Sequence, residues 1–215
     1  MGPRTRALLK DSPRFVQAAV IQFKPGWSTP LLGVTANELT DEIVMLEDIW
    51  GSAGRDLLLD LLRAKSTGQM LERLARAFAT RPRRMPEPTS APLARRAARM
   101  LETEGVQVES VANRLGITAR HLRRAFAENI GLAPKSFARS IRLQRAVRMA
   151  ATSSDWLRIA VDAGYYDQAH LIADFRDLVG LTPSAFAKRA RQLDWALHEA
   201  APSGQASVSS SIELG

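Results

Sequence analysis

The sequence contains no cysteine, and this absence excludes several kinds of chemistry at once. Without a thiol the chain can form no disulfide bond, no zinc–thiolate site and no covalent intermediate on cysteine. Its three histidines, His121, His170 and His198, lie far apart in the sequence, and no phosphate-binding loop or nucleophile elbow accompanies them. We therefore expect neither an enzyme nor a bound metal or cofactor.

Long apolar runs are missing as well. The densest cluster of leucines, between Leu57 and Leu62, is interrupted by Asp60, whereas a membrane-spanning helix needs about 20 consecutive apolar residues. The charged start of the chain, residues 1–6, has no apolar core behind it and does not resemble a secretory signal. We expect a cytoplasmic protein.

Positive charge, by contrast, is in excess and is unevenly distributed. The chain has 30 Lys and Arg against 22 Asp and Glu, which gives a net charge of +8. Residues 93–192 contain 17 basic and 9 acidic residues, whereas residues 1–78 contain 10 and 9. Fifteen of those 17 are Arg, whose planar guanidinium fits phosphates and guanine edges. Net charge alone leaves a solvated basic surface and a polyanionic partner equally open.

Composition also divides the chain into segments. Residues 79–92 contain four prolines in fourteen positions and no apolar periodicity, so we place a Pro/Arg-rich linker at 81–92. Residues 201–215 are rich in Ser, Gly and Ala, which predicts a disordered tail. The linker separates an N-terminal region, residues 1–80, from a helical region, residues 93–200.

The N-terminal region shows mixed patterns. Residues 15–23 are rich in β-branched and aromatic side chains, which predicts a strand. Residues 41–62 predict a helix broken at Gly51 and Gly54, and residues 67–79 carry apolar side chains at helical spacing. One strand and two or three helices do not complete a domain. We therefore expect this region to be the later part of a larger α+β unit, without a closed effector pocket.

The helical region repeats itself. Seven residues recur 49 positions later, namely Leu122, Phe126, Gly131, Leu132, Pro134, Phe137 and Ala138 as Leu171, Phe175, Gly180, Leu181, Pro183, Phe186 and Ala187. Upstream, three recur 48 positions later, namely Val111, Ala112 and Gly116 as Ile159, Ala160 and Gly164. The second copy therefore has one extra residue in its turn, and the same supersecondary unit occurs twice.

The first copy, at about residues 106–130, has the pattern of a helix-turn-helix. Its first helix carries Val111 and Ala112 on one apolar face, and Gly116 follows where a tight turn needs an unhindered backbone. Thr118 can cap a second helix, which returns Leu122 to the same core. In such a motif the second helix protrudes to enter a major groove of DNA.

The outward face of that second helix, predicted at about 118–129, is basic. Arg120, Arg123 and Arg124 share a face, where three like charges favour a polyanionic partner. We predict that these three arginines contact bases, because Arg reads guanine O6 and N7, and that Thr118 and His121 contact phosphates. A solvated basic face is the alternative.

The second copy, at about 154–180, keeps the framework but differs on the reading face. Ser154 can cap its first helix, and Asp167 can cap its second, predicted at about 167–178. The positions that correspond to the three arginines are Ala169, Ile172 and Ala173, which can touch only a thymine methyl. We predict one base contact, from Gln168, and phosphate contacts from His170 and Arg176.

A helix over residues 136–150 should join the two copies. Phe137, Ile141 and Val147 face inward, whereas four arginines at spacing three line the outside, namely Arg139, Arg142, Arg145 and Arg148. The arginine row could meet phosphates or pair with carboxylates; we predict phosphate contacts for Arg139 and Arg142. Two heads on one face of B-DNA would lie about 34 Å apart.

Residues 106–191 resemble the DNA-binding domain of the AraC/XylS family of bacterial regulators. The resemblance rests on three stretches, SVANRLGITARHLRRAF, GLAPKSFARSIRLQRAV and IAVDAGYYDQAHLIADFRDLVGLTPSAF. It implies a seven-helix domain with two helix-turn-helix units, a bipartite DNA site, control of transcription and RNA polymerase as a partner. The stretches GPRTR and FKPGWSTPLLGVTANELTDEIVMLEDIWG resemble the later part of a sensor domain found in some members.

The sequence as a whole thus predicts a mainly α-helical protein, with a small incomplete α+β region ahead of the DNA-binding domain. A helical protein-interaction module without specific DNA binding is one alternative, and a truncated regulator without effector control is another. The operator, the effector and whether the protein forms a homodimer stay open.

Overall fold

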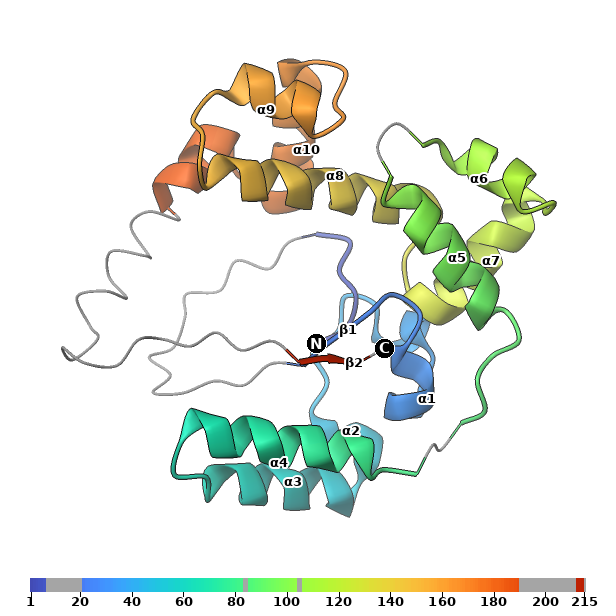
Figure 1. Cartoon of the computed structure of the whole chain (residues 1–215), viewed down its shortest axis with the longest axis vertical. Coiled ribbons are helices and arrows are strands. Elements are labelled where there is room, and N and C mark those ends of the chain that lie inside the picture. Colours follow the sequence, from blue (N-terminus) through green and yellow to red (C-terminus); the bar gives the residue numbers. More distant parts are fainter. Residues whose placement is uncertain (7–20, 83–84, 104–105, 190–211, 215) are drawn as a thin grey trace.

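The computed structural model describes residues 1–6, 21–82, 85–103, 106–189 and 212–214, and it is mainly helical, as the sequence predicts (Figure 1). No helix within these ranges is long and apolar enough to cross a membrane. A helical hairpin lies at one end of the molecule, and the helices of the C-terminal half lie at the other (Figure 1).

The N-terminal half consists of short elements followed by that hairpin. Its elements are β1 (Ile21–Phe23), α1 (Ser28–Leu32), the 3-10 helix η1 (Ala36–Leu39), α2 (Leu46–Trp50), α3 (Ser52–Leu62) and α4 (Thr67–Ala79). The hairpin of α3 and α4 closes over Trp50, Leu57, Leu74 and Phe78, which form one apolar cluster. The helix predicted over 67–79 is confirmed, and Ser66 caps it by accepting a hydrogen bond from the Gln69 N–H.

Two sequence expectations in this half need correction. Gly51 separates α2 from α3 as predicted, but Gly54 lies buried inside α3 instead of breaking it. A Cβ at Gly54 would come within 2.5 Å of the Leu46 carbonyl oxygen, so this glycine allows the close approach of α2 and α3. Of the strand predicted over 15–23, the structure places 21–23 in β1; residues 15–20 lie outside the described residues.

The tail predicted to be disordered over 201–215 contains a short strand, which corrects that prediction for three of its residues. This strand, β2 (Ile212–Leu214), pairs in parallel with β1, with Ile21 opposite Ile212 and Phe23 opposite Leu214. The backbone N–H and C=O groups of β1 need partners, and the ladder with β2 supplies them. The remainder of the tail lies outside the described residues.

Seven helical stretches make up residues 91–189, the number that the resemblance implies. They are α5 (Ala91–Leu101), α6 (Val108–Arg114), α7 (Ala119–Ile130), α8 (Pro134–Ala150), α9 (Trp156–Asp162), α10 (Gln168–Val179) and a last stretch over 183–189. They enclose two separate cores. Phe137 of α8 belongs to the first core with Leu122 and Phe126, and Leu143 of α8 belongs to the second with Phe175.

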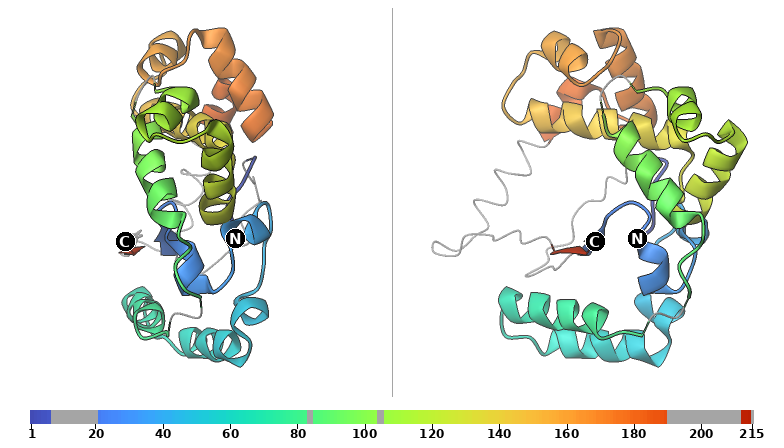
Figure 2. Two further views of the ribbon diagram at one scale, coloured as in Figure 1. Left: turned by 90° about the vertical axis from the view of Figure 1, so that its right-hand side faces the viewer. Right: turned by 45° about the vertical axis from the view of Figure 1, so that its right-hand side comes forward.

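Helix α8 therefore acts as the beam between two units, the first built on α6 and α7 and the second on α9 and α10. Figure 1 shows it running from α5 and α7 at one end to α9 and α10 at the other, and Figure 2 shows the same arrangement from two further sides. Since one continuous helix contributes to both cores, the spacing of the two units is fixed by its length.

The internal repeat is present in the backbone hydrogen bonds. The Ile117 N–H donates to the Ala112 carbonyl at 3.1 Å, and the equivalent Tyr165 N–H donates to the Ala160 carbonyl at 2.9 Å. Both turns use a glycine with positive φ, 65° at Gly116 and 87° at Gly164. The two helix-turn-helix units predicted from the spacing therefore begin their turns in the same way, with the same hydrogen bond and the same glycine conformation, before the extra residue of the second turn.

Caps explain where these helices begin. The Thr118 side chain accepts from the His121 N–H and the Asp167 side chain accepts from the His170 N–H, as predicted. The cap of α9 is Asp155 and not Ser154, because the Asp155 carboxylate accepts from two backbone N–H groups at the start of the helix. A carboxylate with two acceptor oxygens also interacts favourably with the helix dipole.

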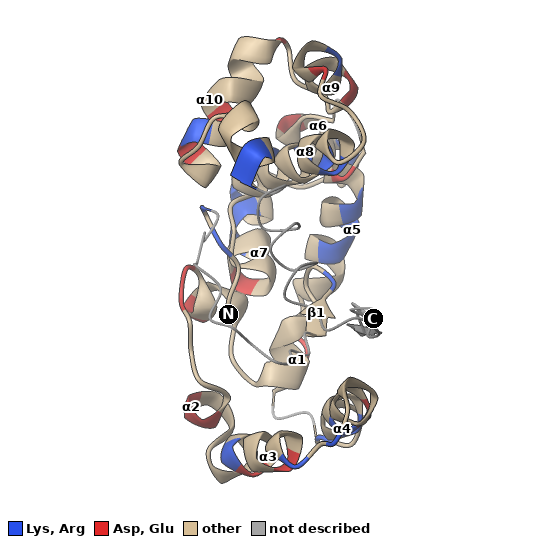
Figure 3. Cartoon of the chain, turned by 90° about the vertical axis from the view of Figure 1, so that its left-hand side faces the viewer, with Lys and Arg blue, Asp and Glu red and all other residues tan. Residues whose placement is uncertain are grey.

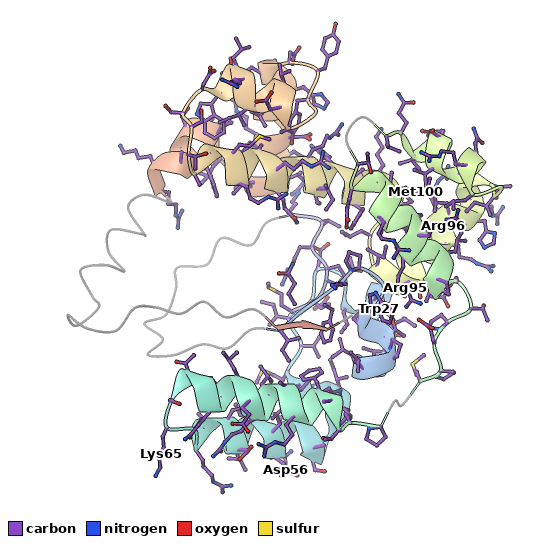
Figure 4. All side chains as sticks on the ribbon, in the orientation of Figure 1. Trp27, Asp56, Lys65, Arg95, Arg96 and Met100 are labelled. Atoms are coloured by element: carbon purple, nitrogen blue, oxygen red, sulfur yellow. The ribbon has the colours of Figure 1, made fainter. Side chains whose placement is uncertain are left out.

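The N-terminal half packs against the first unit. The Thr40 hydroxyl donates to the Gly131 carbonyl at 2.7 Å, just past the end of α7. The Arg95 guanidinium of α5 lies 3.9 Å from the centre of the Trp27 ring, and Figure 4 shows the two side chains against each other. Arg95 is also paired with Glu87, so part of the segment predicted to be an extended linker makes contacts with α5.

Candidate DNA-binding surface

Helix α7 presents its arginines outward. The face that turns inward carries Leu122, Ala125 and Phe126, each at most 1% exposed. Arg120, Arg123 and Arg124 are exposed, as are the neighbouring Thr118 and His121. The structure thus brings together the five residues of the first copy that were predicted to contact DNA, on the first turns of one helix.

No acidic side chain forms an ion pair with these three arginines among the described residues. Glu128, the acidic residue of α7, instead accepts a hydrogen bond from the Ser90 hydroxyl at 2.5 Å. Three guanidinium groups therefore stand on one helix face without an internal counter-charge. The planar guanidinium of arginine can donate two parallel hydrogen bonds. Base edges and phosphates at a major groove offer the paired acceptors for them.

Helix α10 has the same backbone and a different surface. Leu171 and Phe175 are fully buried in the second core, and Ala169 and Ala173 are exposed on the opposite side. Ile172 and Gln168 are partly buried. The reading face of the second unit is therefore apolar, with a single amide near its N-terminal end, as the sequence predicts.

The two residues of α10 predicted to contact phosphates lie in different surroundings. The His170 ring stands edge-on to the Tyr165 ring at 5.3 Å, which ties it to the turn. Arg176 is exposed near the other end of the helix. Burial, together with the charge of Asp174, raises the pKa of the Tyr165 phenol, so this ring stays neutral and serves as packing. Phosphate contacts by His170 and Arg176 stay predictions.

Arg139 is paired with carboxylates of the protein, and the phosphate contact predicted for it stays a prediction. Its Nε donates to Asp174 Oδ1 at 2.6 Å and its Nη1 donates to Asp177 Oδ2 at 2.5 Å, both on α10. Desolvation acts to lower the pKa of Arg139, but the hydrogen bonds to Asp174 and Asp177 and the charges of these carboxylates together outweigh it and raise that pKa. The Asp174 side chain is only 4% exposed, and a carboxylate this buried needs a cation beside it.

Two other arginines of α8, Arg142 and Arg145, also turn toward protein. The Arg142 guanidinium lies 5.4 Å from the centre of the Tyr165 ring, at the turn of the second unit. Arg145 donates to the Glu102 carbonyl at the end of α5. Arg139 and Arg142 thus hold α8 against the second unit and Arg145 holds it against the first. The prediction of a phosphate contact by Arg142 stays untested, and Arg148 is exposed.

Charge is distributed unequally between the two units. Residues 106–131 contain four arginines and two acidic residues, whereas residues 154–180 contain two arginines and five aspartates. Figure 3 shows basic residues along α5 and α8 and acidic ones at α9 and α10. The electrostatic attraction for a polyanion therefore comes mainly from the first unit and from α5.

One residue near this surface was missed by the sequence reasoning. Tyr166 directly precedes the cap of α10 and is 91% exposed. It is the extra residue of the second turn, since the two units correspond with an offset of 48 up to Tyr165 and of 49 from Asp167 onward. The change of offset was itself the signal that could have located it.

Comparison with known proteins agrees with this geometry. A family model described as a helix-turn-helix domain matches residues 111–189. An HTH-type transcriptional regulator of Haemophilus influenzae is 30% identical over 82 residues, which are 38% of this chain and 28% of the relative. The chain thus spans less than a third of the length of that curated relative.

Three solved structures are similar to parts of the chain. The C-terminal domain of AraT, a response regulator from Geobacillus stearothermophilus, is 22% identical, with 47% of this chain and 88% of that chain covered and a TM-score of 0.44. A DNA-binding transcriptional dual regulator from Escherichia coli K-12 is 20% identical, with coverages of 50% and 97% and a TM-score of 0.41. ToxT from Vibrio cholerae is 11% identical, with coverages of 64% and 55% and a TM-score of 0.42.

The family match covers both turns, both outward helices and the α8 beam between them. Residues 111–189 thus match a helix-turn-helix domain, and the curated relative that shares such a stretch is a transcriptional regulator.

Proposed function

We propose that this chain is a sequence-specific regulator of transcription that inserts α7 and α10 into successive major-groove segments of double-stranded DNA. The observation that carries the proposal is the exposed trio Arg120, Arg123 and Arg124, which has no internal counter-charge among the described residues. Each can donate two hydrogen bonds to a guanine, which is the commonest specific contact in a major groove.

In this proposal the two units make different contacts with DNA. Helix α7 supplies the hydrogen bonds that distinguish bases, with Thr118 and His121 against phosphates. Helix α10 adds one base contact through Gln168, and His170, Arg142 and Arg176 add phosphate contacts. The guanidinium of Arg139 is paired with Asp174 and Asp177, so a phosphate contact by Arg139 would have to compete with that pairing. To reach successive major-groove segments on one face of B-DNA, the two heads that α8 joins would have to lie about 34 Å apart.

Such a regulator would act on the bacterial nucleoid in the cytoplasm, with RNA polymerase as its functional partner. Two copies bound to adjacent sites would form a homodimer on DNA. The location, the partner and the dimer all depend on the proposed function, and they would be wrong if it were wrong.

The test is footprinting of the full chain on genomic fragments, followed by titration of the protected site. Arg123→Ala should weaken specific binding by about 5- to 150-fold, the range for one bidentate contact, and should lower the salt slope by about one unit. The matched control is Arg63→Ala, which removes an exposed arginine from the N-terminal half and should leave binding unchanged.

Two results would contradict the proposal. If the chain bound no DNA even at low salt, the function would be wrong. If Arg123→Ala and Gln168→Ala both bound the site like the unmodified chain, α7 and α10 would not be the reading helices.

A protein-interaction role is the second candidate, favoured by apolar side chains exposed on α9. Leu157 is 63% and Val161 is 62% exposed, and the first unit has Glu109 and Asn113 at the equivalent positions. This role predicts no salt-dependent affinity for DNA, whereas a DNA-binding protein loses affinity steeply with salt.

A further inference from the structure

The internal repeat allows each outward position of α10 to be compared with its counterpart on α7. Both helices have twelve residues, both begin after a side-chain cap, and both end at a glycine in the left-handed conformation. With the offset of 49, Arg120 corresponds to Ala169, Arg123 to Ile172 and Arg124 to Ala173. The second unit thus presents a helix in the same way as the first, with an apolar face in place of a cationic one.

This apolar face is not part of the second core. That core is built from Ile159, Ala160, Leu171 and Phe175, each at most 2% exposed. Ala169 and Ala173 are exposed and Ile172 is partly exposed. Because alanine side chains are short, they let the helix backbone come close to the floor of a groove. Unlike the arginines of α7, the side chains of this face cannot donate hydrogen bonds to base edges. They offer a surface for apolar contact instead.

The acidic residues of α10 do not prevent that approach. Asp174 and Asp177 are both held by Arg139, and Asp177 also lies 3.6 Å from Arg6. Asp167 accepts the His170 N–H at the start of the helix. Each carboxylate of α10 and of its cap therefore already has an internal donor.

The major groove offers one apolar group, the C5 methyl of thymine. A G·C pair against an apolar face would lose water from its amino and carbonyl groups without gaining a hydrogen bond, which is unfavourable. The amino and carbonyl groups of an A·T pair would lose water too, but this pair offers a methyl group to the face in return, and the Gln168 amide beside the face matches adenine N6 and N7. The chemistry of the face thus selects A·T pairs.

We propose that α10 reads thymine methyl groups through Ala169, Ile172 and Ala173, so that the second half-site is A·T-rich and is chosen by apolar contact. This inference rests on the proposed function, and it assigns to the second unit a form of sequence selection that needs no arginine. The first half-site, read by α7, is rich in guanine.

The test begins with selection of binding sites from random duplex DNA by the full chain. Each thymine of the second half-site is then replaced by deoxyuridine, which keeps every hydrogen-bonding group and removes only the methyl. We expect affinity to fall about four-fold for each contacted methyl, the amount that corresponds to one buried methylene-sized group. The matched control places deoxyuridine in the first half-site, where affinity should change less than two-fold.

A variant locates the reading group. Ile172→Ala should bind thymine and deoxyuridine sites with nearly equal affinity, because the larger part of the apolar contact is gone. Circular dichroism checks that this variant folds, and the deoxyuridine measurement on the unmodified chain does not depend on it.

The outcomes separate this inference from the proposed function. If the chain bound its site specifically and Arg123→Ala weakened binding, but deoxyuridine in the second half-site had no effect, the methyl reading would be wrong and the function would stand. Selection of G·C-rich second half-sites would likewise contradict the methyl reading and leave the proposed function intact. If no specific site were selected, the methyl reading and the proposed function would both be wrong.

Discussion

The two helix-turn-helix units share a backbone and differ in almost every surface residue. Inside, the equivalent pairs are of one kind: Val111 with Ile159, Ala112 with Ala160, Leu122 with Leu171 and Phe126 with Phe175. Outside, the positions that carry three arginines in α7 carry two alanines and an isoleucine in α10. The buried positions, with the caps and turn glycines, therefore specify the motif, whereas the other exposed positions decide what each motif contacts.

The units also differ in what holds them. The first unit is braced by the N-terminal half, through Thr40 at the end of α7, and by α5. The second has no such neighbour among the described residues, apart from the Arg6 ion pair, and is held by α8 through Arg139. At the position where the first unit has a buried Ala125, the second has the buried Asp174 that receives this arginine.

The largest expected effect tests whether the two cores are equivalent. Phe126→Ala and Phe175→Ala should each lower the free energy of unfolding by about 3–5 kcal/mol, because both rings are fully buried. Urea denaturation followed by circular dichroism measures both losses. A loss below about 1 kcal/mol for either variant would show that its ring is not a core residue.

A smaller effect is expected when the surface of the first unit is transferred to the second. Ile172→Arg places a guanidinium at the position equivalent to Arg123. The slope of log affinity against log salt should steepen by about 0.9, and selected second half-sites should shift toward guanine, a preference of about 1–3 kcal/mol.

The matched control for this transfer is Leu62→Arg, which adds the same charge at a 72% exposed position in the N-terminal half. It should change neither the slope nor the selected sequence. If the slope of log affinity against log salt steepened equally in both variants, α10 would not face the DNA.

The smallest expected effect compares the ends of the two outward helices. Gly131 and Gly180 have nearly the same φ, 77° and 76°, so alanine at either position adds backbone strain of about 1–2 kcal/mol. A Cβ at Gly180 meets nothing, whereas one at Gly131 would come within 2.6 Å of the Ala36 carbonyl oxygen.

Gly131→Ala should therefore destabilise the protein by about 1–3 kcal/mol more than Gly180→Ala, because it also disturbs the contact with η1. Thermal melts of the two variants give the comparison. Equal losses of stability in the two variants would show that the N-terminal half does not contact the end of α7 in solution.

Local patterns in the sequence predicted a large part of this fold. The spacing of apolar residues and glycines located both turns, and Thr118 and Asp167 were identified as caps because a cap acts within three residues of itself. Where two neighbouring residues could both cap, at Ser154 and Asp155, the sequence alone did not separate them. The structure selects Asp155, whose carboxylate reaches two N–H groups.

The arginines show where sequence reasoning stops. Those of α7 and α8 both appear as basic faces with helical spacing, and nothing local distinguishes them. Arg139 is engaged because Asp174 and Asp177, 35 and 38 residues further along, lie across from it once α8 and α10 pack. Gly54 and β2 were misjudged for the same reason, since their partners lie on other elements.

The sequence by itself therefore determined the two-unit helical framework, because periodicity, caps and turn glycines act over a few residues. Only the tertiary structure decided which basic side chains stand on a surface available to DNA. That outcome depends on whether a carboxylate distant in sequence is brought alongside each arginine, as happens for Arg139 but, within the described part of the chain, not for Arg123.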